Sequence, residues 1–381
     1  MPRTATAPAP PPAAPAGAAA RRWRPRVRHV ALAAAVAAAL LLVALPATRR
    51  TPAPTGPQPV ARAWPGAQSA EFPGSLADGP AYEPKLFLDA RVSVGTAPSP
   101  DATALRLVLR AAEGALRELR RLPMTGNPQF DGITSDGDTL AWAETVTAGD
   151  RGRTRMYVAD LRTPGPPRML TADTGDVVFF GSGHDLVIAE QRLRWAASGG
   201  DGSTALRSVA LTGGPVETRT EPGSWAQAAW PWLISGGADR IGAIQVRNLA
   251  DGRTTDVPMS GVESTVCGPA WCRVLVQSAG GLDRIDVMRP DGRDRRTIAD
   301  GSAGAAVVDV AVLDRFEILA VAGPDDAVVT SARLQVYDIA TGRTVDVADG
   351  VDDVASRGGV LWWSTGEDEA TRWHSLDLRT V

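Results

Sequence analysis

The sequence predicts an all-β fold for most of the chain, preceded by one membrane-spanning helix and a proline-rich linker. Three observations carry this prediction. Short apolar, β-branched runs alternate with turn-forming dipeptides from about residue 85 onward, similar strand endings recur along the chain, and residues 1–50 differ sharply in composition from the rest. Short apolar runs bounded by Gly and Asp are typical of strands, and helical periodicity is nearly absent from this part.

Residues 1–28 are predicted to be a disordered, basic cytoplasmic tail. Residues 1–20 contain little besides Pro and Ala, which offer almost nothing to bury in a core. A basic run over residues 21–28 follows them. Residues 1–50 contain eight Arg and no acidic residue, so they carry a charge of +8. Since the whole chain has a net charge of −3, residues 51–381 carry −11. So strong a negative charge argues against nucleic acid as the partner of residues 51–381.

Residues 29–48 are predicted to be a transmembrane helix that anchors the protein in the lipid bilayer. Val30 to Ala47 contains no charged and no strongly polar side chain, and a helix of that length spans about 27 Å, close to the thickness of the hydrocarbon core. Six Arg precede this run and two follow it, which places the N-terminus in the cytoplasm and the C-terminal domain outside. The run is long for a signal peptide, and Leu45 stands where cleavage needs a small residue. We therefore favour a single-pass anchor in the cell membrane over a cleaved signal or a buried helix of a soluble protein.

Residues 49–80 are predicted to be a linker, because Pro recurs every few residues and hydrophobic periodicity is weak. Such a chain is extended and semi-rigid, and it would hold the next domain away from the membrane.

Residues 81–381 are predicted to form one extracytoplasmic β-propeller. Strands that end in a small polar turn begin at Val158, Val209, Val246, Val287, Val336 and Leu376, an average spacing of about 44 residues. A four-stranded propeller blade has this length. The 301 residues therefore allow seven blades, with residues 86–122 as the first, and six or eight blades are the alternatives.

Two local features refine this prediction. Residues 104–122 are expected to form a hairpin around Glu113-Gly114, since Gly in the middle of a helix is unfavourable. The C-terminus offers only three strands, within residues 354–378, so the last blade needs a fourth strand from elsewhere. We expect this strand between Glu71 and Leu88, where Lys85–Leu88 is the most strand-like part, because a propeller must close into a ring.

Some of these motifs resemble a known group of proteins. The turn Ser99-Pro100-Asp101-Ala102 is similar to the Ser-Pro-Asp-Gly turn of TolB-like, WD40-like bacterial β-propeller repeats, with Ala102 in place of Gly. The arrangement also resembles uncharacterised, single-span propeller proteins of GC-rich bacteria. The resemblance implies a fold and a cell-envelope compartment, but no activity, because propellers host unrelated functions.

The two cysteines, Cys267 and Cys272, flank a turn of four residues that contains Gly and Pro. Two strands that leave such a turn bring facing Cα atoms within disulfide range, and the bond persists outside the cytoplasm. A structural disulfide is favoured over free core thiols and over redox or metal chemistry.

Candidates for catalysis are weak, and we predict no catalytic, cofactor-binding or metal-binding residues. Ser182, His184 and Asp185 are the residue types of a hydrolytic triad, but neighbouring strand positions point to opposite faces. The acidic stretches 131–138 and 349–353 lack the spacing of a calcium loop.

Aromatic residues are the remaining candidates. Five Trp cluster in two stretches, and they fit either packing between blades or a binding surface for a glycan or a protein: Trp225, Trp230, Trp232, Trp362 and Trp363. The sequence therefore predicts a non-enzymatic binding module for an envelope protein or glycan, without a cofactor. The alternatives are a propeller-fold hydrolase of the cell envelope and a secreted propeller.

Overall fold

The computed structural model describes residues 56–148, 151–235, 244–322 and 332–381. Residues Gly56–Val381 belong to one compact unit. The predicted tail and the predicted membrane span, residues 1–28 and 29–48, lie outside the described residues. Within the described ranges, no helix has both the length and the hydropathy that a bilayer crossing requires.

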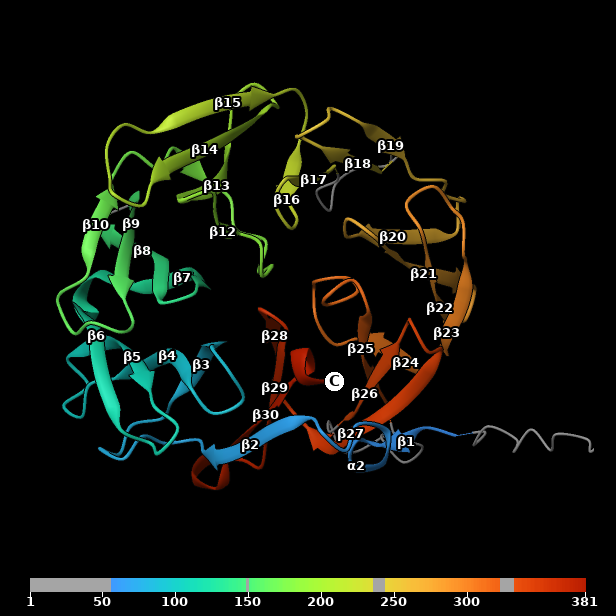
Figure 1. Ribbon diagram of the computed structural model, residues 1–381, viewed down its shortest axis with the longest axis horizontal. Helices are drawn as coiled ribbons and strands as arrows, with labels where there is room; N and C mark the ends of the chain where they lie inside the picture. The colour runs from blue at the N-terminus through green and yellow to red at the C-terminus, as the bar shows by residue number, and fades with distance from the viewer. Residues whose placement is uncertain (1–55, 149–150, 236–243, 323–331) are drawn as a thin grey trace, which may run out of the picture. The chain divides into compact units, whose positions relative to one another are not determined.

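The described residues form seven antiparallel sheets arranged in a ring (Figure 1), which confirms the predicted seven-bladed β-propeller. The strands of a sheet are arranged in chain order from the centre of the ring to its edge (Figure 1), except that two strands from residues 58–73 lie at the outer edges of the sixth and seventh sheets. The first three blades contain β3 (Glu83–Phe87), β4 (Ser93–Pro98), β5 (Ala104–Arg110) and β6 (Leu116–Pro123); β7 (Gln129–Asp136), β8 (Thr139–Ala148), β9 (Arg151–Asp160) and β10 (Arg168–Thr171); and β11 (Asp176–Val177), β12 (Leu186–Ala189), β13 (Arg192–Ser198), β14 (Thr204–Ala210) and β15 (Glu217–Glu221).

The other four blades complete the ring. They contain β16 (Trp225–Gln227), β17 (Trp232–Ser235), β18 (Gln245–Asn248) and β19 (Thr254–Asp256); β20 (Glu263–Cys267), β21 (Cys272–Ser278), β22 (Gly281–Met288) and β23 (Arg296–Asp300); β24 (Ala303–Ala305), β25 (Phe316–Val321), β26 (Ala332–Asp338) and β27 (Arg343–Val351); and β28 (Val354–Arg357), β29 (Val360–Thr365), β30 (Arg372–Asp377) and β2 (Gln68–Pro73). The short helical segments are α2 (Val60–Ala63), η1 (Met124–Gly126), η2 (Asp368–Ala370) and η3 (Leu378–Thr380).

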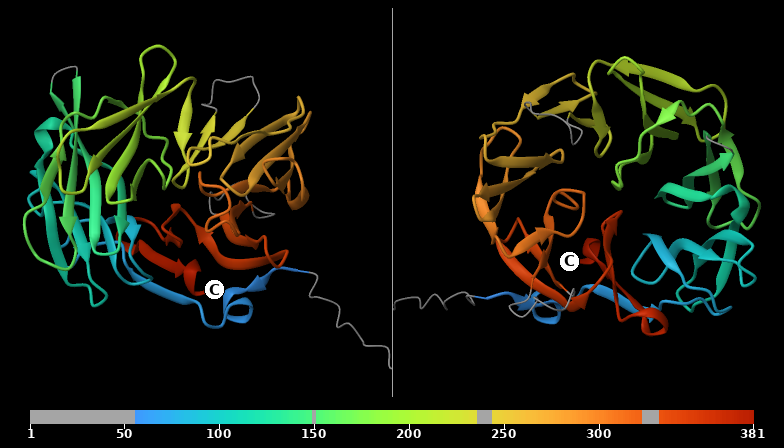
Figure 2. Two further views of the ribbon diagram at one scale, coloured as in Figure 1. Left: turned by 45° about the horizontal axis from the view of Figure 1, so that its top comes forward. Right: turned by 180° about the vertical axis from the view of Figure 1, so that it is seen from behind.

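An N-terminal strand closes the ring. β2 is the outer strand of the seventh blade, antiparallel to β30, with Gln68 opposite Asp377 and Pro73 opposite Arg372. Figure 2 shows this strand, in blue, beside the C-terminal strands in red. The need for a donor strand is confirmed, but its expected position was wrong in part: only residues 71–73 of β2 fall in the range 71–88. The segment that looked most strand-like, from Lys85, lies in β3 of the first blade.

The segment before β2 lies against the sixth blade. β1 (Gln58–Pro59) pairs in parallel with β27, and the Trp64 ring meets the Phe316 ring edge-on at 5.7 Å between centroids. Residues 56–73, assigned to the linker from the sequence, thus make contacts with two blades.

The described apolar side chains gather in seven clusters, and each cluster lies between two neighbouring blades. The cluster between the seventh and first blades joins Phe72 of β2 to Tyr82, Phe87 and Trp362. Each blade is thus stabilised by burial against both neighbours.

The hairpin over residues 104–122 is confirmed. β5 and β6 pair antiparallel from Ala104 opposite Pro123 to Arg110 opposite Leu116. The connecting turn contains Gly114 at φ +83°, a conformation that Gly adopts without strain.

Candidate binding site in the central channel

Two loops enter the centre of the ring, as Figure 1 shows. One precedes β12 in the third blade and covers residues 178–185, and the other joins β24 to β25 in the sixth blade and covers residues 306–315. The loops are joined through Asp309, whose carboxylate accepts hydrogen bonds from Ser182 Oγ at 2.6 Å and from the Gly183 N–H at 2.9 Å. The third and sixth blades are thus connected across the channel.

The loop before β12 is shaped by Asp185. Its carboxylate accepts hydrogen bonds from the N–H groups of Phe180 at 2.9 Å and Gly181 at 2.8 Å, and Gly181 has a φ of +75°. Burial raises the pKa of Asp185, although the two N–H groups and the nearby Arg357 oppose the rise. An Asp that accepts hydrogen bonds from its own loop in this way fixes the backbone of that loop, in which Phe180 lines an apolar pocket.

A buried ion pair holds the other loop. Arg273 of β21 and Glu317 of β25 are 4% and 0% exposed and lie 2.8 Å apart. Arg273 also donates to the carbonyls of Val307 and Asp309, and Glu317 accepts from the Ala311 N–H at 2.6 Å. Buried charges need partners of this kind, and here the partners fix residues 307–311 against the fifth and sixth blades.

A third connection comes from Arg357 of β28. Its guanidinium donates to the Ile133 carbonyl at 2.6 Å and to the Ser182 carbonyl at 3.1 Å. Burial lowers the pKa of Arg357, while Asp185 and Asp309 raise it. The seventh blade is thereby linked to the second and third at the channel.

An apolar pocket of about 250 Å³ opens beside these loops. Four blades contribute to its wall. Three large apolar side chains around it stay partly exposed, Phe180 at 40%, Val266 at 45% and Val308 at 54%, and the remaining apolar lining comes from Ala226, Ala228, Ile234, Pro269 and Val310. Exposed apolar groups that gather around a cavity mark a binding site more often than scattered ones do.

One polar group in the wall of this pocket has no partner. Gln227 is only 7% exposed, it lines the pocket, and its Nε2 makes no hydrogen bond to any described residue. A buried amide without a partner is costly, so a ligand atom that accepts this hydrogen bond would relieve the cost.

A second pocket, of about 270 Å³, shares Val308 and Asp309 with the first but is charged. It is lined by Lys85, the chain's only lysine, and by Glu83, to which Lys85 is paired. Arg357 adds a further charge to this wall. In this wall Lys85 is paired with Glu83, and Arg357 donates to two backbone carbonyls.

The structure places the triad-like residues in these loops without forming a triad. Ser182 Oγ donates to Asp309 and accepts from the His184 backbone N–H at 3.0 Å, and among the described contacts none joins Ser182 Oγ to the imidazole. Burial lowers the pKa of His184, while Asp309 opposes the shift, so the site favours the neutral ring. General-base activation needs a hydrogen bond from the nucleophile to the imidazole.

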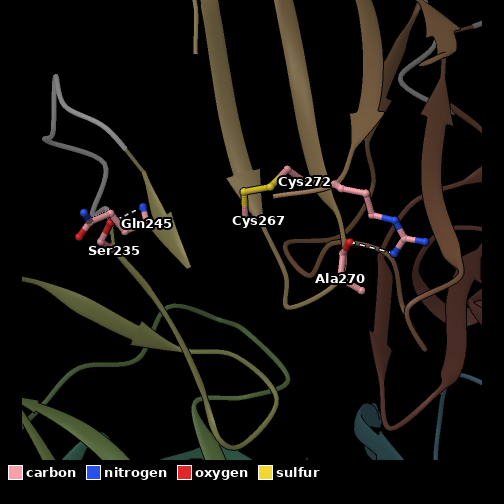
Figure 3. The surroundings of a disulfide bond; sticks show 6 residues. Ser235, Gln245, Cys267, Ala270 and Cys272 are labelled. Carbon is pink, nitrogen blue, oxygen red and sulfur yellow. Dashed lines mark hydrogen bonds between the residues drawn. A yellow bond between two sulfur atoms is a disulfide. The ribbon is translucent and has the colours of Figure 1, made fainter. Parts of the chain in front are cut away.

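The predicted disulfide is present. Cys267 and Cys272 face each other at the ends of β20 and β21 with Cα atoms 3.9 Å apart, and Figure 3 shows the bond at the base of the turn that carries Ala270. Inside the turn, the Gly268 N–H donates to the Trp271 carbonyl at 2.7 Å. Cys267, Gly268 and Pro269 form part of the apolar pocket.

The five candidate Trp do not meet at one surface. Trp225, Trp362 and Trp363 are buried between blades, as the packing interpretation expects. Trp230 is half-buried beneath the Arg194 guanidinium, 3.9 Å from the ring centroid, and Trp232 packs against the cluster between the fourth and fifth blades.

Among the described residues, no group of three or more His, Cys, Asp or Glu side chains is placed to hold a metal ion.

Comparisons with known proteins identify no family for this chain. No family model matches the sequence, and no curated protein matches it. Similar solved structures include the propeller domain of the Trilobed protease from Pyrococcus furiosus (10% identity, 63% of this chain and 80% of that one, TM-score 0.44), a candidate TolB from Agrobacterium tumefaciens (16%, 62% and 84%, 0.37) and an oligogalacturonate lyase in complex with manganese (13%, 80% and 81%, 0.44). Similarity at this level carries no argument about function.

Sequence reasoning missed most of this site. Ser182, His184 and Cys267 were singled out for other reasons, whereas Phe180, Gln227 and Val308 gave no signal. Each is an isolated residue in a short strand or loop, and only the ring closure brings them together.

Proposed function

We propose that the protein is a binding module rather than an enzyme, and that its apolar channel pocket receives an apolar side chain of a protein partner. The observation that carries this proposal is the set of exposed apolar side chains, Phe180, Val266 and Val308, around a cavity whose wall holds the unpartnered Gln227 amide. A protein segment supplies both an apolar side chain and a carbonyl that accepts from Gln227. A glycan would leave the apolar wall without a matching surface, which is why a protein partner is favoured.

The binding free energy expected from these two contacts is sufficient for recognition of a partner. Burying one large apolar side chain contributes about 1.5–3 kcal/mol, and one new hydrogen bond about 1 kcal/mol. Together these terms correspond to roughly 70- to 900-fold in affinity.

We further propose that residues 29–48 anchor the module in the cell membrane and that the propeller lies outside the cytoplasm. The uncharged run Val30–Ala47 and the excess of Arg before it support this arrangement. The disulfide is consistent with it, since such bonds persist in oxidising compartments. A reporter enzyme fused after Val381 should be active only outside the cytoplasm, and activity inside would refute the orientation.

The binding proposal is tested by photocrosslinking in intact cells. A photoreactive amino acid replaces Val266 or Val308 at the pocket, or Met169 as a control that is equally exposed, at 48%, on β10. We expect one discrete, protease-sensitive adduct from the two pocket positions and none from position 169. The adduct should weaken when Gln227→Leu is added. Adducts of equal yield at all three positions, or none at the pocket, would refute a site here, and an adduct sensitive only to glycosidases would identify a glycan instead.

A further inference from the structure

A groove of about 750 Å³ lies between the fifth and sixth blades, apart from the channel pocket. Its wall contains four arginines and two acidic residues: Arg289, Arg295, Arg296, Arg315, Asp294 and Asp314. A volume of this size is in the range of small-molecule sites. Residues 51–381 carry a net charge of −11, so four guanidinium groups in one groove differ in sign from the overall charge of this part of the chain.

Two of these arginines are held against one indole ring. The guanidinium carbon of Arg289 lies 3.8 Å from the centroid of Trp271, and that of Arg296 lies 5.4 Å from it. Trp271 is itself fixed, because it is 6% exposed and its Nε1–H donates to the Asp314 carbonyl at 3.1 Å. Guanidinium groups are favourably placed over an indole face.

The contacts of these two arginines leave nitrogen atoms free. Arg289 donates through Nη1 to the Ala270 carbonyl at 3.2 Å and through Nε to Asp294 at 3.3 Å, and Arg296 donates through Nη2 to the Ile339 carbonyl. Nη2 of Arg289 and both Nε and Nη1 of Arg296 have no hydrogen-bond partner among the described residues. Arg296 thus has no acidic partner there, whereas Arg289, Arg295 and Arg315 each have one.

The other two arginines are already paired. Arg295 is bonded to Glu263 and Asp286, and Arg315 makes a two-fold contact with Asp338 at 2.9 and 2.8 Å. These pairs stabilise the fold around the groove, whereas Arg289 and Arg296 keep donors for a ligand. The guanidinium groups of Arg289 and Arg296 are both immobilised by carbonyl and indole contacts. Binding of a ligand to them therefore costs less conformational entropy than binding to mobile side chains would.

We propose that this groove binds a small anion bearing phosphate or carboxylate groups, whose oxygens accept hydrogen bonds from Arg289 and Arg296 beside Trp271. Oxyanions are the ligands that the planar donor fork of Arg matches best. The apolar part of the ligand would contact Ile339 and Ala340, which line the same groove.

The test is calorimetric titration of the full-length chain with inorganic phosphate, glycerol 3-phosphate and succinate, at matched ionic strength with chloride as the control anion. We expect saturable binding of one equivalent of at least one of the three oxyanions and none of chloride. Binding of the two phosphates alone would identify a phosphate site, and binding of succinate alone a dicarboxylate site. Heats that never saturate, or that equal those of chloride, would overturn the proposal.

Variants locate the site. Arg289→Gln and Arg296→Gln should each weaken binding at least about tenfold, while Arg296→Lys, which keeps the charge but loses the fork, should be intermediate. Arg333→Gln is the matched control, because Arg333 is a partly exposed arginine in β26 of the sixth blade and pairs with Asp349 outside the groove. A thermal unfolding scan confirms that each variant folds. Equal affinity in Arg289→Gln, Arg296→Gln and Arg333→Gln would overturn the assignment to this groove.

Discussion

Closure of the ring by β2 can be tested with a single side chain. Phe72 is 3% exposed, and its ring lies 6.3 Å from Tyr82 and 6.0 Å from Phe87, centroid to centroid. The Arg110 guanidinium covers it at 4.0 Å. Truncation of a buried Phe to Ala costs about 3–5 kcal/mol, so Phe72→Ala should reduce the free energy of unfolding by that amount. Phe72→Leu, which keeps most of the volume, should cost less than about 1.5 kcal/mol.

The neighbouring residue is the control. Glu71 lies on the same strand but faces solvent, where it pairs with Arg372, and both side chains are about half exposed. An exposed pair contributes about 0–1 kcal/mol, so Glu71→Ala should change stability little. Urea unfolding of the full-length chain, followed by fluorescence, measures the difference between the variants. Unfolding midpoints of Phe72→Ala and Glu71→Ala that coincide would show that β2 does not close the ring in solution.

Two further predictions concern charge and the disulfide. Burial raises the pKa of Asp338, but its hydrogen bonds to Arg315 and Thr341 outweigh burial and hold the pKa below the ordinary value of 3.8. The stabilisation from Asp338 is therefore complete well above pH 3.8 and declines as the pH falls below that value, so Asp338→Asn should cost about 1–3 kcal/mol at neutral pH and progressively less in acid. Urea unfolding at several pH values measures this cost, and a cost that does not change with pH would contradict the pairing. Cys267 and Cys272 lie five positions apart in the chain, so the disulfide closes a small loop and the double variant to Ser should lose only about 2 kcal/mol. Thiol labelling of the denatured, non-reduced native protein should be absent at both positions, and labelling at both would refute the bond.

The blade architecture could be predicted because the turns of each repeat are recognisable in the sequence. Asp-Gly and Thr-Gly dipeptides between short apolar runs mark the ends of strands, and their recurrence reports the length of a blade. The disulfide was predictable for the same local reason, since the turn between β20 and β21 is short.

The closing strand was harder to place. β2 has the sequence Gln-Ser-Ala-Glu-Phe-Pro, and Phe72 is its only fully buried residue. An outer strand with one buried side chain shows no alternation of polar and apolar residues, so its sequence resembles a linker. Lys85-Leu-Phe looked more strand-like because it belongs to β3, an inner strand with apolar residues on both sides.

Neither candidate site could be found from sequence periodicity. The channel pocket takes Phe180, Gln227, Val266 and Val308 from four blades, and these residues are up to 128 positions apart. In the groove, a turn of the chain brings Arg289 and Arg296 to the same Trp271 ring, and no sequence motif marks this arrangement. The residues of both sites come together only because certain loops lie beside each other once the ring has closed, and this depends on the whole fold.

The two sites share their walls. The turn closed by the disulfide contributes Gly268 and Pro269 to the channel pocket and Ala270 and Trp271 to the groove, and the loop 306–315 divides in the same way. Coupling between sites requires an element with two arrangements that both ligands can bias. Here the disulfide restrains the turn, and the buried Arg273–Glu317 pair holds the loop to the blade that carries the turn. Because the shared walls are held in one arrangement, the sites should bind independently, and the affinity for phosphate should be the same with and without the protein partner.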